Sequence, residues 1–200
     1  KNQYTFTRAS LGTNGWRSVQ ASLEWCASNG ALFGFGIMTA YDGGNGVAFE
    51  VGVGQYPLYL HKMMQRESVK DWLYNNRDWI PNWNSPSYLS RWQALNDTLL
   101  RYIKNWSYTP LTGPWAGKQV NGKDLIDFVD LRGYGNFGEW HTYPWTKSQP
   151  AKAICTDSSM KKIIDISVNI YGDYPLHVPF AIFDDAIWTE SNAWRTWYVL

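Results

Sequence analysis

The amino-acid sequence predicts an α/β fold built on a parallel sheet. Stretches with helical periodicity alternate with short apolar runs along most of the chain, and such alternation is typical of right-handed βαβ units. A length of 200 residues is enough for one domain with a sizeable core. We therefore treat residues 1–200 as a single segment of one domain.

The first half of the chain predicts a helix, a strand and a long connection. Apolar side chains recur on one face of residues 16–28, and Asn29-Gly30 supplies a stop signal for this helix. The short apolar run 31–38 predicts a buried strand. Residues 40–85 have no regular pattern. A connection this long is expected to be functional or to carry local structure of its own.

The next helix has the clearest signals in the chain. Apolar residues recur at helical spacing over 86–104, Ser85 is placed to cap the helix, and Pro86 lies in its first turn. Residues 106–122 are expected to form a loop. The apolar run 125–132 that follows predicts a second buried strand.

The last part of the chain continues the alternation. Asp157 or Ser158 is expected to open a third helix, which ends at Gly172-Asp173. Residues 177–183 predict a further strand. The tail 190–200 resembles the start of another helix.

Polar and aromatic side chains gather just after the predicted strands. They are Tyr41 and Asp42, then Glu139, Trp140 and His141, then Asp184 and Asp185. (β/α)8 TIM barrels place their chemistry at the carboxyl ends of parallel strands, and a complete barrel needs eight strands and about 250 residues. The chain is shorter and shows fewer strands, so we expect it to form part of such a barrel. No Gly-x-Gly-x-x-Gly turn opens a helix, so a dinucleotide site is not predicted.

The segment 126–141 carries the strongest candidate site. It begins as a strand, contains several glycines from Gly133 onward, and then presents Glu139, Trp140 and His141 in succession. Glycines at a strand end let the chain turn sharply and let a ligand approach closely. A carboxylate between such a turn and an aromatic ring suits acid/base chemistry on sugars. The alternative is an ordinary turn in which Glu139 pairs with an arginine such as Arg132.

Aromatic residues are unusually frequent, with 13 Trp and 13 Tyr. A core rarely needs so many Trp, because each buried indole N–H must find a partner. Some of these rings are therefore expected to line a surface or cleft that stacks on sugars, while a good share pack in the interior. The candidates for such a surface are Trp79, Trp83, Tyr134, Trp140, Trp145 and Trp188.

The run Asp130-Leu-Arg-Gly-Tyr-Gly-Asn-Phe-Gly-Glu-Trp-His141 resembles a known strand ending. An uncharacterised family of glycoside hydrolase-type barrels carries the form D-[IL]-R-G-Y-G-x-[WF]-G-E-W-H at the end of strand 4. Weaker similarities to family 42-type β-galactosidases lie at residues 4–6, 27–38 and 79–86, with Gly36 where Arg is usual. This resemblance implies that the chain covers strands 3, 4 and 5 of the barrel.

The resemblance also implies roles for individual residues. Glu139 would be the general acid/base, although Gly138 precedes it where the wider superfamily usually has Asn. The second catalytic carboxylate would come from strand 7, outside this chain. Asp184 and Asp185 are the local substitutes, and one of them is as well explained as a helix cap or a substrate acceptor. The expected substrate-binding residues are Tyr134, Asn136, Trp140, His141, Trp145, Asp184 and Asp185.

Two charged residues near this site are expected to have a structural role. Asp130 and Arg132 lie two residues apart and therefore share one face of their strand. Buried charges need partners, so we expect these two to form an ion pair.

Composition excludes several partner classes. The net charge is +1 without a basic stripe, which disfavours nucleic acid. No apolar run is long enough to span a bilayer. The three histidines lie far apart and no Cys-x-x-Cys or His-Glu-x-x-His spacing occurs, so neither a metal nor another cofactor is expected.

The sequence therefore predicts a glycoside hydrolase with Glu139 as general acid/base and a carbohydrate as partner, together with the rest of its barrel or other domains. The alternatives are a non-catalytic carbohydrate-binding barrel and a structural module whose Trp-rich surface docks other domains. The chain begins at Lys1 rather than Met, as a processed or excised segment would. We expect a secreted or cell-surface location.

Overall fold

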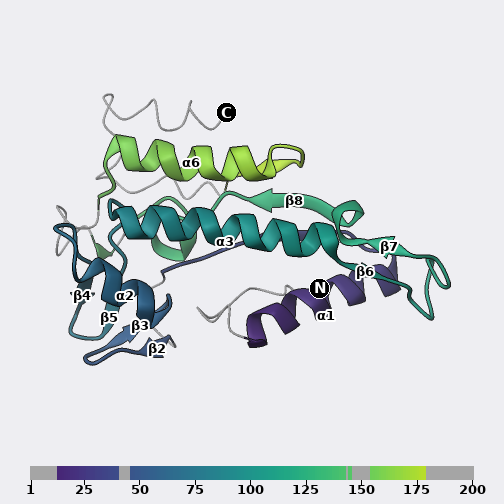
Figure 1. The fold of residues 1–200 in the computed structure, drawn as a ribbon, viewed down its shortest axis with the longest axis horizontal. Coiled ribbons are helices and arrows are strands. Elements are labelled where there is room, and N and C mark those ends of the chain that lie inside the picture. The colour runs from purple at the N-terminus through teal and green to yellow at the C-terminus, as the bar shows by residue number, and fades with distance from the viewer. Residues whose placement is uncertain (1–12, 41–45, 143, 146–153, 179–200) are drawn as a thin grey trace.

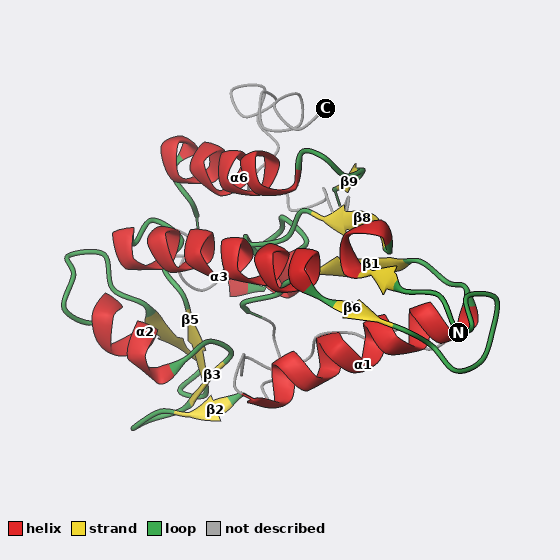
Figure 2. Ribbon diagram, turned by 45° about the vertical axis from the view of Figure 1, so that its right-hand side comes forward, coloured by secondary structure: helices red, strands yellow, loops and turns green. Residues whose placement is uncertain are grey.

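The structure, a computed structural model, is a small mixed α/β domain with short sheets (Figure 1). It describes residues 13–40, 46–142, 144–145 and 154–178. Helix α3 runs through the middle of the molecule, with α6 on one side and α1 on the other (Figure 1 and Figure 2). The bounds of these helices are Thr13–Asn29 for α1, Pro86–Asn105 for α3 and Asp157–Tyr171 for α6.

A parallel sheet of three strands lies against these helices. Its order is β1-β8-β9, and both pairings are parallel, as the βα alternation predicts. Asp130 of the central strand lies opposite Gly36 on one side and His177 on the other. The carboxyl ends of all three strands therefore meet at one edge of the sheet. The strand bounds are Phe33–Gly36 for β1, Ile126–Asp130 for β8 and Leu176–His177 for β9.

The predicted helices over 16–28 and 86–104 are confirmed. In α1 the buried face carries Val19, Leu23 and Cys26. At the start of α3 the Ser85 side chain accepts a hydrogen bond from the Tyr88 backbone N–H at 3.0 Å, which is the expected cap.

The third helix begins at Asp157 as predicted, and the preceding residue, Thr156, is its cap. The Thr156 hydroxyl accepts from the Ser159 backbone N–H at 3.3 Å, and Thr156 has an extended backbone with φ −67° and ψ 154°. Asp157 lies within the helix and so cannot serve as its N-cap. The helix therefore opens at Asp157, the first of the two residues predicted to open it, and Thr156 caps it.

The connection 40–85 carries local structure of its own, which is one of the two outcomes expected for it. A mixed sheet of order β2-β3-β5-β4 packs with helix α2 beside the N-terminal end of α3 (Figure 1). Strand β3 runs parallel to β5, and the other two pairings are antiparallel. The bounds are Val47–Ala48 for β2, Val53–Gly54 for β3, Leu58–Met64 for α2, Trp72–Tyr74 for β4 and Asp78–Ile80 for β5.

The predicted loop 106–122 contains a short antiparallel hairpin. Strand β6 (Ser107–Tyr108) pairs with β7 (Val120–Asn121), and the 3-10 helix η1 (Gly122–Asp124) leads into β8. The predicted strand 177–183 begins at Leu176, and its residues after 178 lie outside the described part of the chain. The predicted helix 190–200 lies outside it as well.

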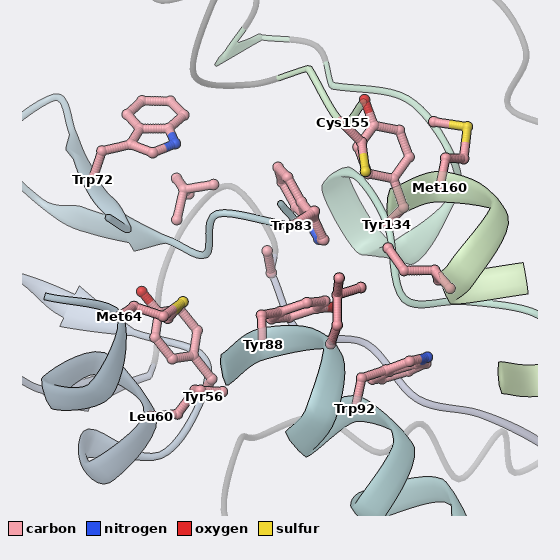
Figure 3. Packing of buried hydrophobic residues seen from close by; sticks show 14 of the residues in the cluster. Tyr56, Leu60, Met64, Trp72, Trp83, Tyr88, Trp92, Tyr134, Cys155 and Met160 are labelled. Carbon is pink, nitrogen blue, oxygen red and sulfur yellow. The ribbon is translucent and has the colours of Figure 1, made fainter. Parts of the chain in front are cut away.

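The core consists of two clusters that share α3 and α6. One cluster joins α1, β1 and β8 to these helices, and the other joins α2, β4 and β5 to them. Figure 3 shows part of the second cluster, with Trp83, Tyr88, Trp92 and Tyr134 close together. In the described ranges, no helix combines the length and apolar character needed to cross a membrane.

Candidate functional site

The segment after β8 folds back on itself at the carboxyl edge of the parallel sheet. The Asn136 backbone N–H donates to the His141 carbonyl at 2.7 Å, and the Trp140 N–H donates to the Tyr134 carbonyl at 3.2 Å. The short 3-10 helix η2 (Asn136–Gly138) forms the tip of the fold-back. Positive φ angles at Gly133, Gly135 and Gly138 allow the chain to turn this tightly.

Two contacts tie this segment to Thr39 and Ala40, which follow β1. The Phe137 N–H donates to the Ala40 carbonyl at 3.0 Å. From α3, the Tyr88 hydroxyl lies 2.9 Å from the Thr39 hydroxyl and donates to the Gly133 carbonyl at 2.5 Å. Burial raises the pKa of the Tyr88 phenol well above its usual range. Tyr88 therefore stays neutral and joins the residues that follow β1 to those that follow β8.

Four charged or titratable side chains cluster on this segment. Arg132 donates to the Asp130 carboxylate at 3.2 Å from Nε and 3.0 Å from Nη2, which is the predicted ion pair. Its Nη1 donates to the Phe137 carbonyl at 2.7 Å and lies 3.8 Å from Glu139 Oε1. On the other side, His141 Nε2 lies 3.8 Å from Glu139 Oε2. The side chains are 18–35% exposed, with Glu139 the most accessible.

Glu139 is held by charge rather than by close hydrogen bonds. Both of its cationic or polar neighbours are 3.8 Å away, and its carboxylate accepts no hydrogen bond from any described residue. A carboxylate in this state can accept a hydrogen bond from a ligand hydroxyl or exchange a proton with the ligand. The predicted pairing of Glu139 with Arg132 is therefore present only as a loose contact, because Arg132 makes its hydrogen bonds to Asp130 and Phe137.

The predicted aromatic contacts divide into buried and accessible rings. Tyr134 and Trp145 are each 0% exposed. Trp83, itself buried, packs on both of them, with ring centroids 5.0 Å from Tyr134 and 5.8 Å from Trp145. Figure 3 shows Trp83 beside Tyr134. These rings line the core beneath the segment rather than its surface. Trp140 is half-buried, and its indole N–H donates to the Leu131 carbonyl at 2.6 Å.

The remaining predicted site residues are placed as follows. Asn136 is buried at 4% exposure, whereas the His141 side chain is 18% exposed beside Glu139. Asp184, Asp185 and Trp188 lie outside the described residues. Within the described ranges, no group of three or more His, Cys, Asp or Glu side chains is placed to hold a metal ion.

Sequence reasoning missed Phe137, which is 38% exposed at the tip of the fold-back. Its φ of 54° puts it in the left-handed region that Gly and Asn favour. The signal available in the sequence was its position between Gly135 and Gly138, in a run where turns are expected.

Sequence reasoning also missed a buried polar network around Asp71. Its Oδ2 accepts from the Tyr56 hydroxyl at 2.6 Å and contacts His61 Nδ1 at 2.7 Å, and its Oδ1 accepts from Gln65 Nε2. Burial first, and then the nearby Asp71 carboxylate, raise the pKa of Tyr56 well above its usual range. The network fixes α2 to the residue before β4. His61 and Gln65 lie one helical turn apart, but no motif links them to Asp71.

The geometry of this network sets the tautomer of His61. An ionised carboxylate can only accept hydrogen bonds, so His61 Nδ1 carries the proton and donates to Asp71. The imidazole ring is further held by Phe49 and Trp79, whose centroids lie 4.6 Å and 4.5 Å from it. The side chain of His61 is 10% exposed, so this dyad is mainly an internal support for the small mixed sheet.

Comparisons of the chain with protein-family models, with curated proteins and with solved structures found no match. The relationship to glycoside hydrolase-type barrels therefore remains a prediction from the motif at 130–141.

Proposed function

We propose that the chain belongs to a glycoside hydrolase-type protein in which Glu139 acts as general acid/base on a carbohydrate. One observation carries this proposal. Glu139 lies just beyond the carboxyl end of the central strand of a parallel sheet, 35% exposed and with no close hydrogen bond from a described residue. Ligands of open α/β sheets and barrels bind at this edge.

The neighbours of Glu139 suit a polyhydroxylated ligand. Asp130 and Glu139 offer acceptor oxygens, while Arg132 and His141 offer donors within 3.8 Å of Glu139. In the proposed reaction, protonated Glu139 donates to the glycosidic oxygen as the bond from that oxygen to the anomeric carbon breaks. In a retaining mechanism its anion later accepts a proton from the water that attacks the anomeric carbon. Arg132 would stabilise the anion between these two steps.

Hydrolysis also needs a second carboxyl group, about 5–5.5 Å away for retention or about 6.5–9.5 Å for inversion. In the described part of the chain, the other carboxylate of this cluster is Asp130, and Arg132 already holds it through two hydrogen bonds. This favours Asp184, Asp185 or a residue outside the chain as the partner. It also supports the second candidate function, a carbohydrate-binding module without hydrolysis.

The test uses the natural full-length protein with Glu139→Gln and a panel of nitrophenyl glycosides. Loss of a general acid/base should lower kcat by about 10²–10⁴-fold. Asp127→Asn is the matched control, because Asp127 is an exposed carboxylate of the same strand β8 and should leave kcat unchanged.

Three other outcomes decide between the candidates. Hydrolysis that survives Glu139→Gln at the wild-type rate would remove Glu139 as acid/base. Glycan binding without hydrolysis in either form would favour the binding module. A wild-type protein that neither binds a glycan array nor cleaves any glycoside would exclude both carbohydrate functions.

A further inference from the structure

The side chain of Arg132 is flanked by two glycines from separate segments of the chain. A Cβ added at Gly36, the last residue of β1, would lie 2.9 Å from Arg132 Cδ and 3.0 Å from its Nε. A Cβ added at Gly138 of η2 would lie 2.8 Å from Arg132 Cβ and 3.3 Å from its Cγ. Carbon atoms pack best at about 3.5–4.0 Å, so a larger residue at either position would displace the Arg132 side chain.

Backbone conformation accounts for the glycine at Gly138 but not for the one at Gly36. Gly138 has a φ of 67°, which by itself favours glycine, whereas the φ of Gly36 lies outside the left-handed region. In a strand, glycine costs conformational entropy and supplies no side chain for packing. Close approach of β8 explains Gly36 instead, because its added Cβ would also lie 2.7 Å from Asp130 Cβ.

The guanidinium of Arg132 links the position of its side chain to the segment that carries Glu139. Its Nε and Nη2 donate to Asp130 at 3.2 Å and 3.0 Å. Its Nη1 donates to the Phe137 carbonyl at 2.7 Å and lies 3.8 Å from Glu139 Oε1. The donors of a guanidinium are fixed in one plane. A shift of Cδ and Nε therefore moves all of these contacts together.

We propose that Gly36 is a positioning residue for Glu139. Gly36 acts through Arg132 and not by contact with a ligand. It leaves room for the Arg132 side chain over β1, and Arg132 then holds the fold-back and keeps a cation beside the Glu139 carboxylate. This inference rests on the proposed function and deepens it, because it adds β1 to the segments that set the geometry of the acid/base.

Gly34 offers a matched control on the same strand. Residues two apart in a strand point to the same face. A Cβ added at Gly34 would meet the Phe128 ring at a shorter distance than any contact made by a Cβ at Gly36. Alanine at Gly34 therefore also crowds a side chain of β8. That side chain stacks on His177, with ring centroids 4.4 Å apart, and is not part of the Arg132 contacts.

The experiment compares Gly36→Ala and Gly34→Ala with wild type in the natural full-length protein. The first measurement is the NMR signal of the Arg132 Nε–H in protein made with isotope-labelled arginine, identified by its loss in Arg132→Lys. Exchange of this proton with solvent reports the hydrogen bond to Asp130 and needs no activity. The second measurement is kcat and KM on the nitrophenyl glycosides that wild type cleaves.

We expect Gly36→Ala to speed exchange of the Arg132 Nε–H by about tenfold or more, as loss of a hydrogen bond between charged groups implies. Its kcat should fall by about 10²-fold, which is the effect of misplacing a reacting group by about 1 Å. KM should change little, because Gly36 does not contact the ligand in this role. Gly34→Ala should keep both the exchange rate and kcat near their wild-type values.

Three results would overturn the inference. One is wild-type exchange of the Arg132 Nε–H in Gly36→Ala. Another is faster exchange in that variant with a wild-type kcat. The third is an equal fall of kcat in Gly34→Ala, which would make the effect a general disturbance of β1.

Arg132→Lys covers the case in which Gly36→Ala does not fold. Lysine keeps the charge but lacks the forked donors that hold Asp130 and the Phe137 carbonyl. Its kcat should therefore fall as well, and a wild-type kcat would overturn the inference. A wild-type protein that cleaves no glycoside would overturn the proposed function, and this role with it. The exchange measurement distinguishes that failure from a misplaced Arg132, because it does not depend on hydrolysis.

Discussion

Left-handed backbone conformations shape the segment that carries Glu139. Gly133, Gly135 and Gly138 all have positive φ, and a side chain at Gly135 would meet the backbone of His141. The fold-back that brings Glu139 and His141 together therefore needs glycine at this position for two reasons. One is the conformation itself, and the other is the close approach of two backbone segments.

Replacing Gly135 by Ala should measure the sum of these two effects. Gly117 is a matched control, because its φ is also positive at 72° but a Cβ added there would have no neighbouring atom within 4 Å. We expect Gly117→Ala to lower the free energy of unfolding by about 1 kcal/mol. Gly135→Ala should lower it by about 3 kcal/mol or more, because the His141 backbone must also move. Urea unfolding measures both, and equal losses would contradict the close approach.

The glycine run and the carboxylate after it were predictable, because both are local features of residues 126–141. Which aromatic rings are buried and which are exposed could not be predicted. Tyr134 and Trp145 are buried while Phe137 is exposed, although all three lie in the same short stretch. The difference arises from Trp83, which is distant in sequence and packs on the first two rings.

Helix ends show how local signals act at the level of secondary structure. Ser85 and Thr156 both have extended backbones, and their hydroxyls accept from the N–H three residues later. Such a cap satisfies one of the backbone donors that the first turn of a helix leaves without an intrahelical partner. At the start of α6 the chain reads Thr156-Asp157-Ser158, and the backbone geometry assigns the cap to Thr156.

This assignment can be tested with two substitutions in α6. We expect Thr156→Ala to lower the free energy of unfolding by about 1 kcal/mol through loss of the cap. Ser158→Ala should change it by less than about 0.5 kcal/mol, because Ser158 is exposed and lies inside the first turn. Chemical denaturation of the two variants decides the matter, and a larger effect at Ser158 would refute the assignment of Thr156.

Short strands were harder to foresee than helices. Strands β2, β3, β6, β7 and β9 each have two residues, too few for an alternating pattern to stand out. They exist because another strand pairs with them, as Val53 and Gly54 pair with Asp78 and Trp79. Sequence patterns could therefore indicate structure within 40–85 without specifying its strands.

Across the whole molecule, three buried tyrosines join elements that are far apart in sequence. The Tyr56 hydroxyl is hydrogen-bonded to Asp71, which precedes β4. The Tyr88 hydroxyl is hydrogen-bonded to Thr39 and Gly133. The Tyr171 hydroxyl of α6 donates to the Asn96 side chain of α3 at 3.0 Å. Burial is the main cause that raises the pKa of each phenol. Each hydroxyl is therefore kept neutral in the folded state.

These tyrosines predict a loss of stability at alkaline pH. In the unfolded chain they ionise near pH 10, whereas the raised pKa keeps them protonated in the folded state. Their contribution is fully present below about pH 10 and is lost as pH rises toward the folded pKa. Above about pH 10, each tyrosine should lower the free energy of unfolding by about 1.4 kcal/mol per pH unit.

Urea unfolding at a series of alkaline pH values measures this slope. With Tyr171→Phe, the free energy of unfolding should fall less steeply with pH. The difference in slope should be the contribution of one tyrosine, because phenylalanine releases no proton on unfolding. Its stability at neutral pH should fall by about 1 kcal/mol through loss of the bond to Asn96. An alkaline slope identical to that of wild type would contradict the buried, neutral state of Tyr171.

Local patterns were sufficient for the three long helices, for the parallel pairing of β1 with β8, and for the position of Glu139 after β8. Periodicity, caps and glycine placement depend on residues close together in the chain, so they can be recognised without a structure. The burial of Tyr134 and Trp145, the exposure of Phe137 and the meeting of His61 with Asp71 required the folded chain. Each of these depends on side chains from separate elements packing together, and packing of this kind leaves no periodic trace in the sequence.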